Sequence, residues 1–348
     1  MKIEKLYLVE LLRFLSSISV LIYHYQVYFF QYNKFNSIEI LNNLKDLPFN
    51  FFLILFYKYG DYGVQMFWCI SGFIISYVYL DKIKSVSAKN FFINRFSRLY
   101  PLHLLTLVFV LIVQQASNYF TGDYQLFYLN DLYHFILHFF FISGWGFEKG
   151  MSFNEPIWSV SLELIAYFLF FIIVSNLKRL NIITTLTIYI IFFLINKNFY
   201  GSSDNHADLI SCLQLFISGM IIFQLFKKMK KIHIIVFSLI LLVLSIVGNF
   251  KIFMFCPAVL LIFLISEDYF KNMINKKFFS FLGNLTYSLY LIHSPVAMII
   301  MIFFKSNTNI YFSYEFFLFY FTFLILNGAL IYYYVEKKLQ NSLRKYLK

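Results

Sequence analysis

The sequence predicts an all-α integral membrane protein with about ten transmembrane helices, and three observations lead to that fold class. The first is composition: 60% of the 348 residues are hydrophobic and only 13% are charged, with 48 Phe. A water-soluble core cannot bury that much apolar surface, so we expect a lipid bilayer around the chain. No linker rich in Pro, Gly or Ser interrupts the sequence, and we expect one membrane domain over residues 1–348.

The second observation is the recurrence of apolar segments near the length of about 20 residues that a helix needs to cross a bilayer. They lie near residues 8–30, 62–80, 99–116, 157–175, 181–195, 208–226, 232–248, 251–266, 283–304 and 312–335. The first is too long for a removable signal peptide, so we expect it to remain as a span. The segment 126–143 is not counted, because the topology closes only without it. We expect a re-entrant or interfacial helix there, and an eleventh span is the alternative.

The third observation is the distribution of the net charge of +12. Lys and Arg, such as Lys178 and Arg179 after the fourth segment, are roughly three times as numerous on one side of the predicted spans as on the other. This positive-inside bias places both termini in the cytoplasm and makes nucleic-acid binding unnecessary as an explanation. The three cysteines lie singly in apolar segments and predict neither a disulfide framework nor a metal cluster.

The first span carries Glu10, Arg13 and His24 within an otherwise apolar helix. Charged groups at membrane depth cost roughly 2.5 to 3.5 kcal/mol each, so they indicate function by default. Arg13 and His24 are close to three turns apart and share a face with Ser17 and Val20, with His24 about 16 Å further along the helix. Glu10 lies one turn before Arg13 and can pair with it. The alternative is that Arg13 extends to the interface and His24 makes a structural hydrogen bond.

Arg95 and Arg98 form a second basic set at the cytoplasmic mouth of the third span. Residues three apart are neighbours on a helix, and each guanidinium offers a planar fork that suits a phosphate group. Ordinary anchoring of a cytoplasmic loop by positive charge is the alternative.

Two later spans also carry polar residues. Glu163 lies one to two turns into the fourth span, beyond Trp158 at the level of an interfacial aromatic belt. A carboxylate there can orient a histidine, accept a hydrogen bond from a sugar hydroxyl or pair with a cation. The ninth span holds Tyr287, Tyr290 and His293, for which packing is the alternative explanation.

Together these segments resemble acyltransferase family 3, whose integral membrane enzymes acylate surface polysaccharides, lipid-linked glycans and related acceptors. The resemblance rests on five motifs in the family's order: ELLRFLSSISVLIYH, FWCISGFIIS, NRFSRLYP, WSVSLELIAYF and LGNLTYSLYLIHSPV. VEKKL near the C-terminus resembles the family's closing Val-Glu. The chain departs from the family pattern at Thr286, where Ser is common, and at Ser294, where an aromatic residue often precedes the Pro.

The resemblance implies a multi-pass enzyme of the bacterial inner membrane that moves an acyl group, taken as acetyl, from cytoplasmic acyl-CoA to a glycan hydroxyl. It implies that Arg13, Arg95 and Arg98 bind acyl-CoA, and that His24 and Glu163 are catalytic. His24 is then the general base, with an acyl-histidine intermediate as the alternative. The residues assigned to acceptor binding or structural support are Glu10, Ser71, Gly72, Trp158, Tyr167, Tyr287 and His293. Acetyl-CoA is a substrate, and no bound cofactor or metal is expected.

A transporter or flippase for a glycan lipid or small solute shares the broad pattern of many spans with polar residues at depth. Against it, the sequence has no repeated halves and no pair of Gly- or Pro-broken spans in corresponding positions. A metal enzyme is a third class, because Asp131, His134 and His138 have i, i+3, i+7 spacing on one helix face. Interfacial histidines are more often structural, which favours the prediction without metal.

Overall fold

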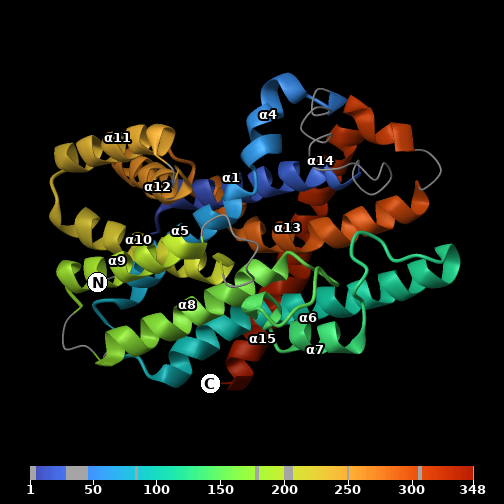
Figure 1. Ribbon diagram of the computed structural model, residues 1–348, viewed down its shortest axis with the longest axis horizontal. Helices are drawn as coiled ribbons and strands as arrows, with labels where there is room; N and C mark the ends of the chain where they lie inside the picture. The colour runs from blue at the N-terminus through green and yellow to red at the C-terminus, as the bar shows by residue number, and fades with distance from the viewer. Residues whose placement is uncertain are drawn as a thin grey trace. The chain divides into compact units, whose positions relative to one another are not determined.

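The computed structural model describes residues 5–28, 46–82, 85–176, 180–199, 207–248, 251–270, 272–304 and 308–347. Every regular element within these ranges is a helix (Figure 1). Lys178 and Arg179, which the sequence places on the inner side, lie outside the described residues.

Each of the ten predicted apolar segments contains a helix. These are α1 (Tyr7–Tyr25), α5 (Tyr62–Tyr79), α6 (Ala88–Thr121), α8 (Ile157–Asn176), α9 (Ile182–Phe199), α10 (Ala207–Lys228), α11 (Lys231–Val247), α12 (Lys251–Phe270), α13 (Lys276–Phe303) and α14 (Tyr314–Ile331). Shorter elements are α4 (Asn50–Tyr59), α7 (Leu132–Phe139), a π-helical turn (Tyr332–Glu336) and α15 (Lys337–Leu347).

Seven of the described helices are long and apolar enough to cross a membrane: α1, α6, α8, α10, α12, α13 and α14 with its continuation to Leu347. Over the described residues α9 and α11 are apolar but shorter. Both expose large apolar side chains, such as Ile183 at 71% and Val247 at 80%, which a lipid-facing surface tolerates and a water-facing one does not. The protein is therefore a multi-pass membrane protein, while the count of about ten spans and the cytoplasmic termini stay predictions.

The segment 126–143 does not cross a membrane as a helix. Its helix α7 has eight residues and begins at the cap residue Asp131, whose carboxylate accepts a hydrogen bond from the backbone N–H of His134. Eight residues rise about 12 Å, less than half of a hydrocarbon core of about 30 Å. Helix α7 alone is therefore too short to cross the membrane, and its place as a re-entrant or interfacial helix stays a prediction.

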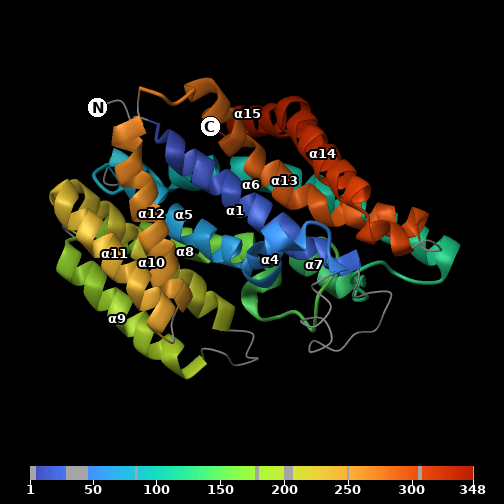
Figure 2. The same ribbon diagram turned by 90° about the horizontal axis from the view of Figure 1, so that it is seen from above.

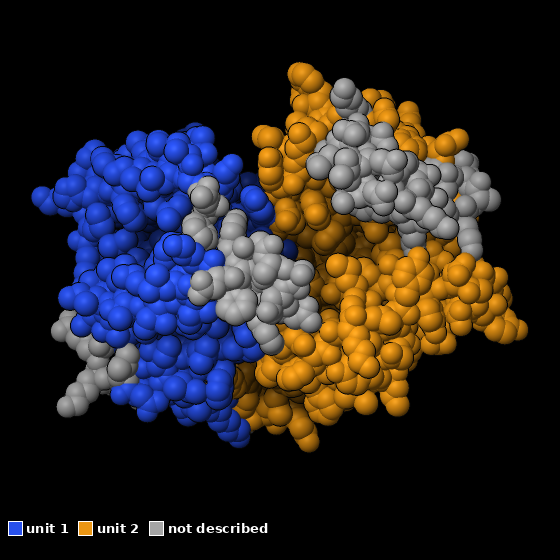
Figure 3. Space-filling view, viewed as in Figure 1, with its two compact units in different colours: residues 1–16, 62–91, 160–284 blue, residues 17–61, 92–159, 285–348 orange. Residues whose placement is uncertain are grey.

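The chain forms two compact units, each from three separate stretches of sequence (Figure 3). Unit 1 contains residues 1–16, 62–91 and 160–284, and unit 2 contains residues 17–61, 92–159 and 285–348. Because the stretches alternate along the chain, neither unit is a contiguous sequence domain.

Helices α5 and α10 cross very closely within unit 1, where α10 also packs on α9 and α11 packs on α12 (Figure 2). A Cβ atom on Gly72 would lie 1.8 Å from the carbonyl oxygen of Phe216, and one on Gly219 would lie 2.0 Å from that of Cys69. Both positions therefore require glycine, as is common where membrane helices approach backbone to backbone. Gly72 was predicted either to bind the acceptor or to have a structural role, and this close helix crossing favours the structural role.

The start of α1 is held within unit 1 by a carboxylate from another helix. Glu267 of α12 accepts hydrogen bonds from the backbone N–H groups of Tyr7 at 2.8 Å and Leu8 at 2.6 Å. These N–H groups have no partner inside the helix, and the N-terminal end of a helix favours negative charge. Glu267 thereby fixes where α1 begins.

The other end of α1 is packed among aromatic rings of unit 2. Tyr25 is fully buried, donates its hydroxyl to the carbonyl oxygen of Tyr311 at 2.8 Å, and meets Phe317 of α14 edge to face. Tyr28 stacks on Tyr311 with ring centroids 4.6 Å apart. Such aromatic pairs add about 0.5 to 1.5 kcal/mol each beyond the burial of their area. This packing fixes the backbone directly after His24.

Candidate active site

His24 and His293 form a directly hydrogen-bonded pair in unit 2. Nδ1 of His24, on α1, lies 3.0 Å from Nε2 of His293, on α13. The two rings are stacked, with centroids 5.0 Å apart and planes inclined by 7°. His293 is buried, and its Nδ1 lies 2.7 Å from the carbonyl oxygen of Tyr290, one turn earlier on α13. The sequence named both histidines but did not predict that they meet.

These contacts determine which ring nitrogens carry protons. A carbonyl oxygen only accepts, so Nδ1 of His293 donates to Tyr290 and Nε2 of the neutral ring carries the lone pair. Nδ1 of His24 must then donate to that lone pair, which leaves the lone pair of His24 on its Nε2. A neutral imidazole held in one tautomer by a second group is the arrangement that a general base or a nucleophile needs.

Asn154 holds the turn of α13 that carries His293. Pro295 has no N–H, so the carbonyl of Leu291, four residues earlier, loses its helical donor. Asn154 donates its Nδ2 to that carbonyl at 3.0 Å, and both partners are buried. Sequence reasoning missed Asn154. Pro295 was the available signal, because it predicts an unpaired carbonyl without saying which distant residue satisfies it.

A second contact joins the same two segments. Ser159, in the first turn of α8, donates its hydroxyl to the carbonyl of Pro156 at 3.1 Å, and Tyr290 Oη lies 2.8 Å from Ser159 Oγ. Because the Ser159 proton is used, Tyr290 is the donor in this pair. Trp158 precedes Ser159 on the same turn and is partly buried. The segment predicted to carry Trp158 and Glu163 thus also supplies residues that support His293.

Arg95 and Arg98 lie on α6, where both are partly exposed and can meet a ligand. Ser97, between them, is fully buried. Its hydroxyl lies 3.4 Å from Nε of Arg344, which comes from the C-terminal helix α15. The structure therefore brings a third arginine, which the sequence did not single out, to the turn that carries the pair.

Tyr287 connects α13 to the same part of α6. Its hydroxyl donates to the carbonyl oxygen of Leu99 at 2.6 Å. Leu99 directly follows Arg98 in the sequence, and the ring of Tyr287 is buried. Tyr287 lies six residues before His293 on one continuous helix. The contact supports the structural role predicted for Tyr287, because it links the helix of the arginines to the helix of the histidine.

Glu10 and Arg13 form the predicted ion pair in unit 1. Nη1 of Arg13 donates to Oε2 of Glu10 at 2.9 Å. Gly283 of α13 makes room for this carboxylate, since a Cβ atom there would lie 1.9 Å from Glu10 Oε2. Arg13 and His24 lie on the unbroken helix α1, and Ser17 and Val20, on the same face, are fully buried. That face is therefore turned into the protein and away from lipid.

Three further predicted residues form a hydrogen-bonded chain in unit 1. Tyr167 Oη donates to Glu163 Oε1 at 2.5 Å, one turn earlier on α8, and Ser71 Oγ of α5 lies 2.9 Å from Tyr167 Oη. The proton of Tyr167 is used on Glu163, so Ser71 is the donor to Tyr167. The carboxylate of Glu163 thus ends a chain of two hydroxyl groups, a use that the sequence did not predict.

The metal site considered from the sequence does not form from its three residues. Asp131 Oδ1 pairs with His134 Nδ1 at 2.8 Å, while His138 directs Nε2 to Glu148 Oε1 at 3.1 Å. Among the described residues, the ligand set that lies close enough for one metal ion is His138, Glu148 and Glu155. Helix spacing alone selected the wrong partners for His138.

Comparison with known proteins gives one match. The family model of an acyltransferase domain, that of acyltransferase family 3, matches residues 6–336. Neither the curated proteins nor the solved structures contain a match. The matched range covers nearly the whole chain and includes every predicted site residue. The chain therefore belongs to acyltransferase family 3 and is a membrane acyltransferase.

Proposed function

We propose that the protein transfers an acetyl group from cytoplasmic acetyl-CoA to a hydroxyl of a cell-surface polysaccharide or lipid-linked glycan, in the bacterial inner membrane. The observation that carries this proposal is the His24–His293 pair, which leaves the lone pair of His24 on Nε2. Family membership accounts for acyl transfer, and this pair supplies the base that an acceptor hydroxyl needs.

In the proposed step, Nε2 of His24 takes the proton of the acceptor hydroxyl while the oxygen attacks the thioester carbonyl. The carbon–sulfur bond then breaks, and the leaving sulfur takes the proton back from Nε2 as CoA thiol. One ester forms for each thioester lost, and no net proton is released. His293 accepts the hydrogen bond from Nδ1 of His24 throughout, so the imidazolium that forms between the two transfers is stabilised.

Arg95 and Arg98 are proposed to bind the phosphates of CoA. Guanidinium groups one turn apart offer two planar forks to the 3′-phosphate and the diphosphate, and such charge-assisted bonds are the strong ones. Arg13 is assigned to the same donor from its place on α1, with Glu10 holding its side chain. Tyr287 supports this role from the neighbouring helix, through its bond to the carbonyl of Leu99.

Glu163 is proposed to bind the acceptor. A carboxylate accepts several hydrogen bonds, so the bond from Tyr167 to Oε1 leaves capacity for a sugar hydroxyl. The bonds from Ser71 and Tyr167 fix the direction in which the carboxylate points.

The test is release of CoA thiol by the purified protein in proteoliposomes that contain lipid-linked saccharides from the same membrane. An acetyltransferase releases one thiol for each acetyl ester found on the saccharide by mass spectrometry. A transporter or flippase releases none, and that result would refute the proposal. Omitting the acceptor separates the two routes, because an acyl-histidine intermediate gives one thiol per protein without it, whereas direct transfer gives none.

A further inference from the structure

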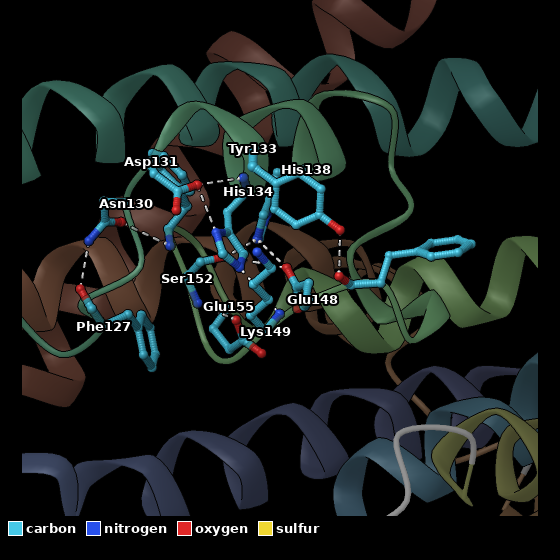
Figure 4. A network of polar contacts seen from close by, with 12 residues as sticks. Phe127, Asn130, Asp131, Tyr133, His134, His138, Glu148, Lys149, Ser152 and Glu155 are labelled. Carbon is cyan, nitrogen blue, oxygen red and sulfur yellow. Dashed lines mark hydrogen bonds and ion pairs between the residues drawn. The ribbon is translucent and has the colours of Figure 1, made fainter.

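A histidine and two glutamates converge between α7 and the loop before α8 (Figure 4). One ligand atom from each of His138, Glu148 and Glu155 lies within 4.8 Å of the others. The side chain of His138 is 0% exposed and that of Glu148 is 12% exposed. All three belong to unit 2, and none has a part in the proposed acyl transfer.

Among the described residues, no lysine or arginine forms an ion pair with the two carboxylates of this buried cluster. In the described chain, Oε1 of Glu148 lies 3.1 Å from Nε2 of His138. The neighbouring Lys149 turns its ammonium group to the ring of Tyr133, 5.3 Å from the centroid. Two buried carboxylates this close to one another cost free energy when no positive charge lies between them. A positive charge between them would remove this cost.

His138 is neutral and does not supply that charge. Its second ring nitrogen, Nδ1, is buried without a hydrogen-bond partner among the described residues. Protonating the ring would therefore bury an unpaired N–H as well as a charge. Neutral imidazole is the form that binds metal ions.

Ser152 contacts all three side chains and fixes their direction. Its backbone N–H donates to Glu155 Oε2 at 2.8 Å, its hydroxyl donates to Glu148 Oε1 at 3.2 Å, and Oγ lies 3.0 Å from His138 Nε2. The carbonyl oxygen of His138 lies 2.8 Å from Nε2 of His103 on α6. Supporting hydrogen bonds of this kind orient the ligands of metal sites.

We propose that His138, Glu148 and Glu155 bind one divalent transition-metal ion, and that this ligand set suits Zn²⁺. One imidazole nitrogen and two carboxylate oxygens are ordinary zinc ligands, at about 2.0 to 2.2 Å, so in a tetrahedral site the ligand atoms lie roughly 3.3 to 3.6 Å apart. The ligand atoms, which lie up to 4.8 Å apart, therefore move closer together when the ion binds. The ion would join α7 to the loop that leads to Asn154, and the proposal departs from the prediction of a protein without metal.

Full-length protein, purified in detergent through a tag without histidine and stripped with a chelator, provides the test. The wild type should retain about one equivalent of Zn²⁺ after dialysis, measured by elemental mass spectrometry, and should develop the visible absorption of bound Co²⁺. Glu155→Gln and His138→Gln should each weaken Zn²⁺ binding at least tenfold. Asp131→Asn is the matched control, because it removes an exposed carboxylate of the same segment that pairs with His134.

Three results would overturn the proposal: a wild type that retains no Zn²⁺, a Glu155→Gln variant that retains as much as the wild type, or a loss caused by Asp131→Asn instead. In the first case, a Glu155→Gln variant that is more stable than the wild type would show that the two carboxyl groups share a proton. If the ligand variants do not fold, the test is the effect of added Zn²⁺ on the unfolding temperature of the proteins that do fold. Zn²⁺ must raise it equally for the wild type and Asp131→Asn.

Discussion

The imidazole of His293 accepts a hydrogen bond from that of His24, with Nδ1 of His24 3.0 Å from Nε2 of His293. Removing the acceptor frees His24 to adopt the tautomer in which Nε2 is protonated and cannot act as a base. We expect His293→Ala to lower kcat for thiol release roughly 10²- to 10⁴-fold, with the KM for acetyl-CoA little changed.

His293→Gln supplies the control, because its amide oxygen can accept the bond from His24. It should recover part of the lost kcat, which a purely structural role would not give. If His293→Ala turns over like the wild type, His293 does not position His24.

The hydrogen bond from Asn154 to the carbonyl of Leu291 should contribute measurably to the stability of the folded protein. Asn154→Ala leaves the buried carbonyl of Leu291 without a donor, which costs about 1 to 3 kcal/mol. We expect a lower unfolding temperature in detergent and slower thiol release. Asn327→Ala is the matched control, since its bond to the carbonyl of Phe323 lies at the exposed surface of α14, and it should change stability by less than about 0.5 kcal/mol. Equal effects of the two substitutions would contradict the role of Asn154.

Substituting the arginines of α6 should weaken the binding of acetyl-CoA and leave the later steps of the reaction unchanged. Arg95→Ala and Arg98→Ala each remove charge-assisted bonds worth about 1.5 to 3 kcal/mol, so the KM for acetyl-CoA should rise roughly 10- to 100-fold while kcat changes little. Lysine at either position should recover only part of the affinity, because it lacks the planar fork. Lys89→Ala, an exposed cation of the same helix, should have no effect. An unchanged KM in the arginine variants would exclude them from the donor site.

The hydrogen bonds that connect Ser71, Tyr167 and Glu163 should affect the binding of the acceptor saccharide. Tyr167→Phe removes both the bond to Glu163 and the acceptor for Ser71, so we expect the KM for the saccharide to rise about tenfold without a change for acetyl-CoA. Glu163→Gln should be more severe, because it removes the carboxylate itself. Tyr189→Phe is the control, since the Tyr189 hydroxyl accepts a hydrogen bond from Gln214 and has no contact with Glu163 among the described hydrogen bonds of unit 1. A donor-specific effect of Tyr167→Phe would contradict this assignment.

The helices and the pairing of Glu10 with Arg13 could be predicted because they depend on residues near one another in sequence. The contact between His24 and His293 could not be predicted, because periodicity within one helix does not say which distant helix packs against it. Pro295 marked a free carbonyl, yet its partner Asn154 lies 137 residues from Leu291. Spacing on one helix also suggested Asp131 and His134 as partners of His138. The residues that lie beside His138 are Glu148 and Glu155, which belong to an irregular loop and follow no period.

In the proposed reaction, Nε2 of His24 takes the proton of the acceptor hydroxyl. The measurement that tests it most directly compares His24→Gln with His233→Gln, an exposed histidine of α11, for acceptor-dependent release of CoA thiol in proteoliposomes. We predict that His24→Gln loses at least about 10²-fold in kcat while acetyl-CoA still binds, and that His233→Gln retains the wild-type rate. Thiol release by folded His24→Gln at the wild-type rate would contradict the account.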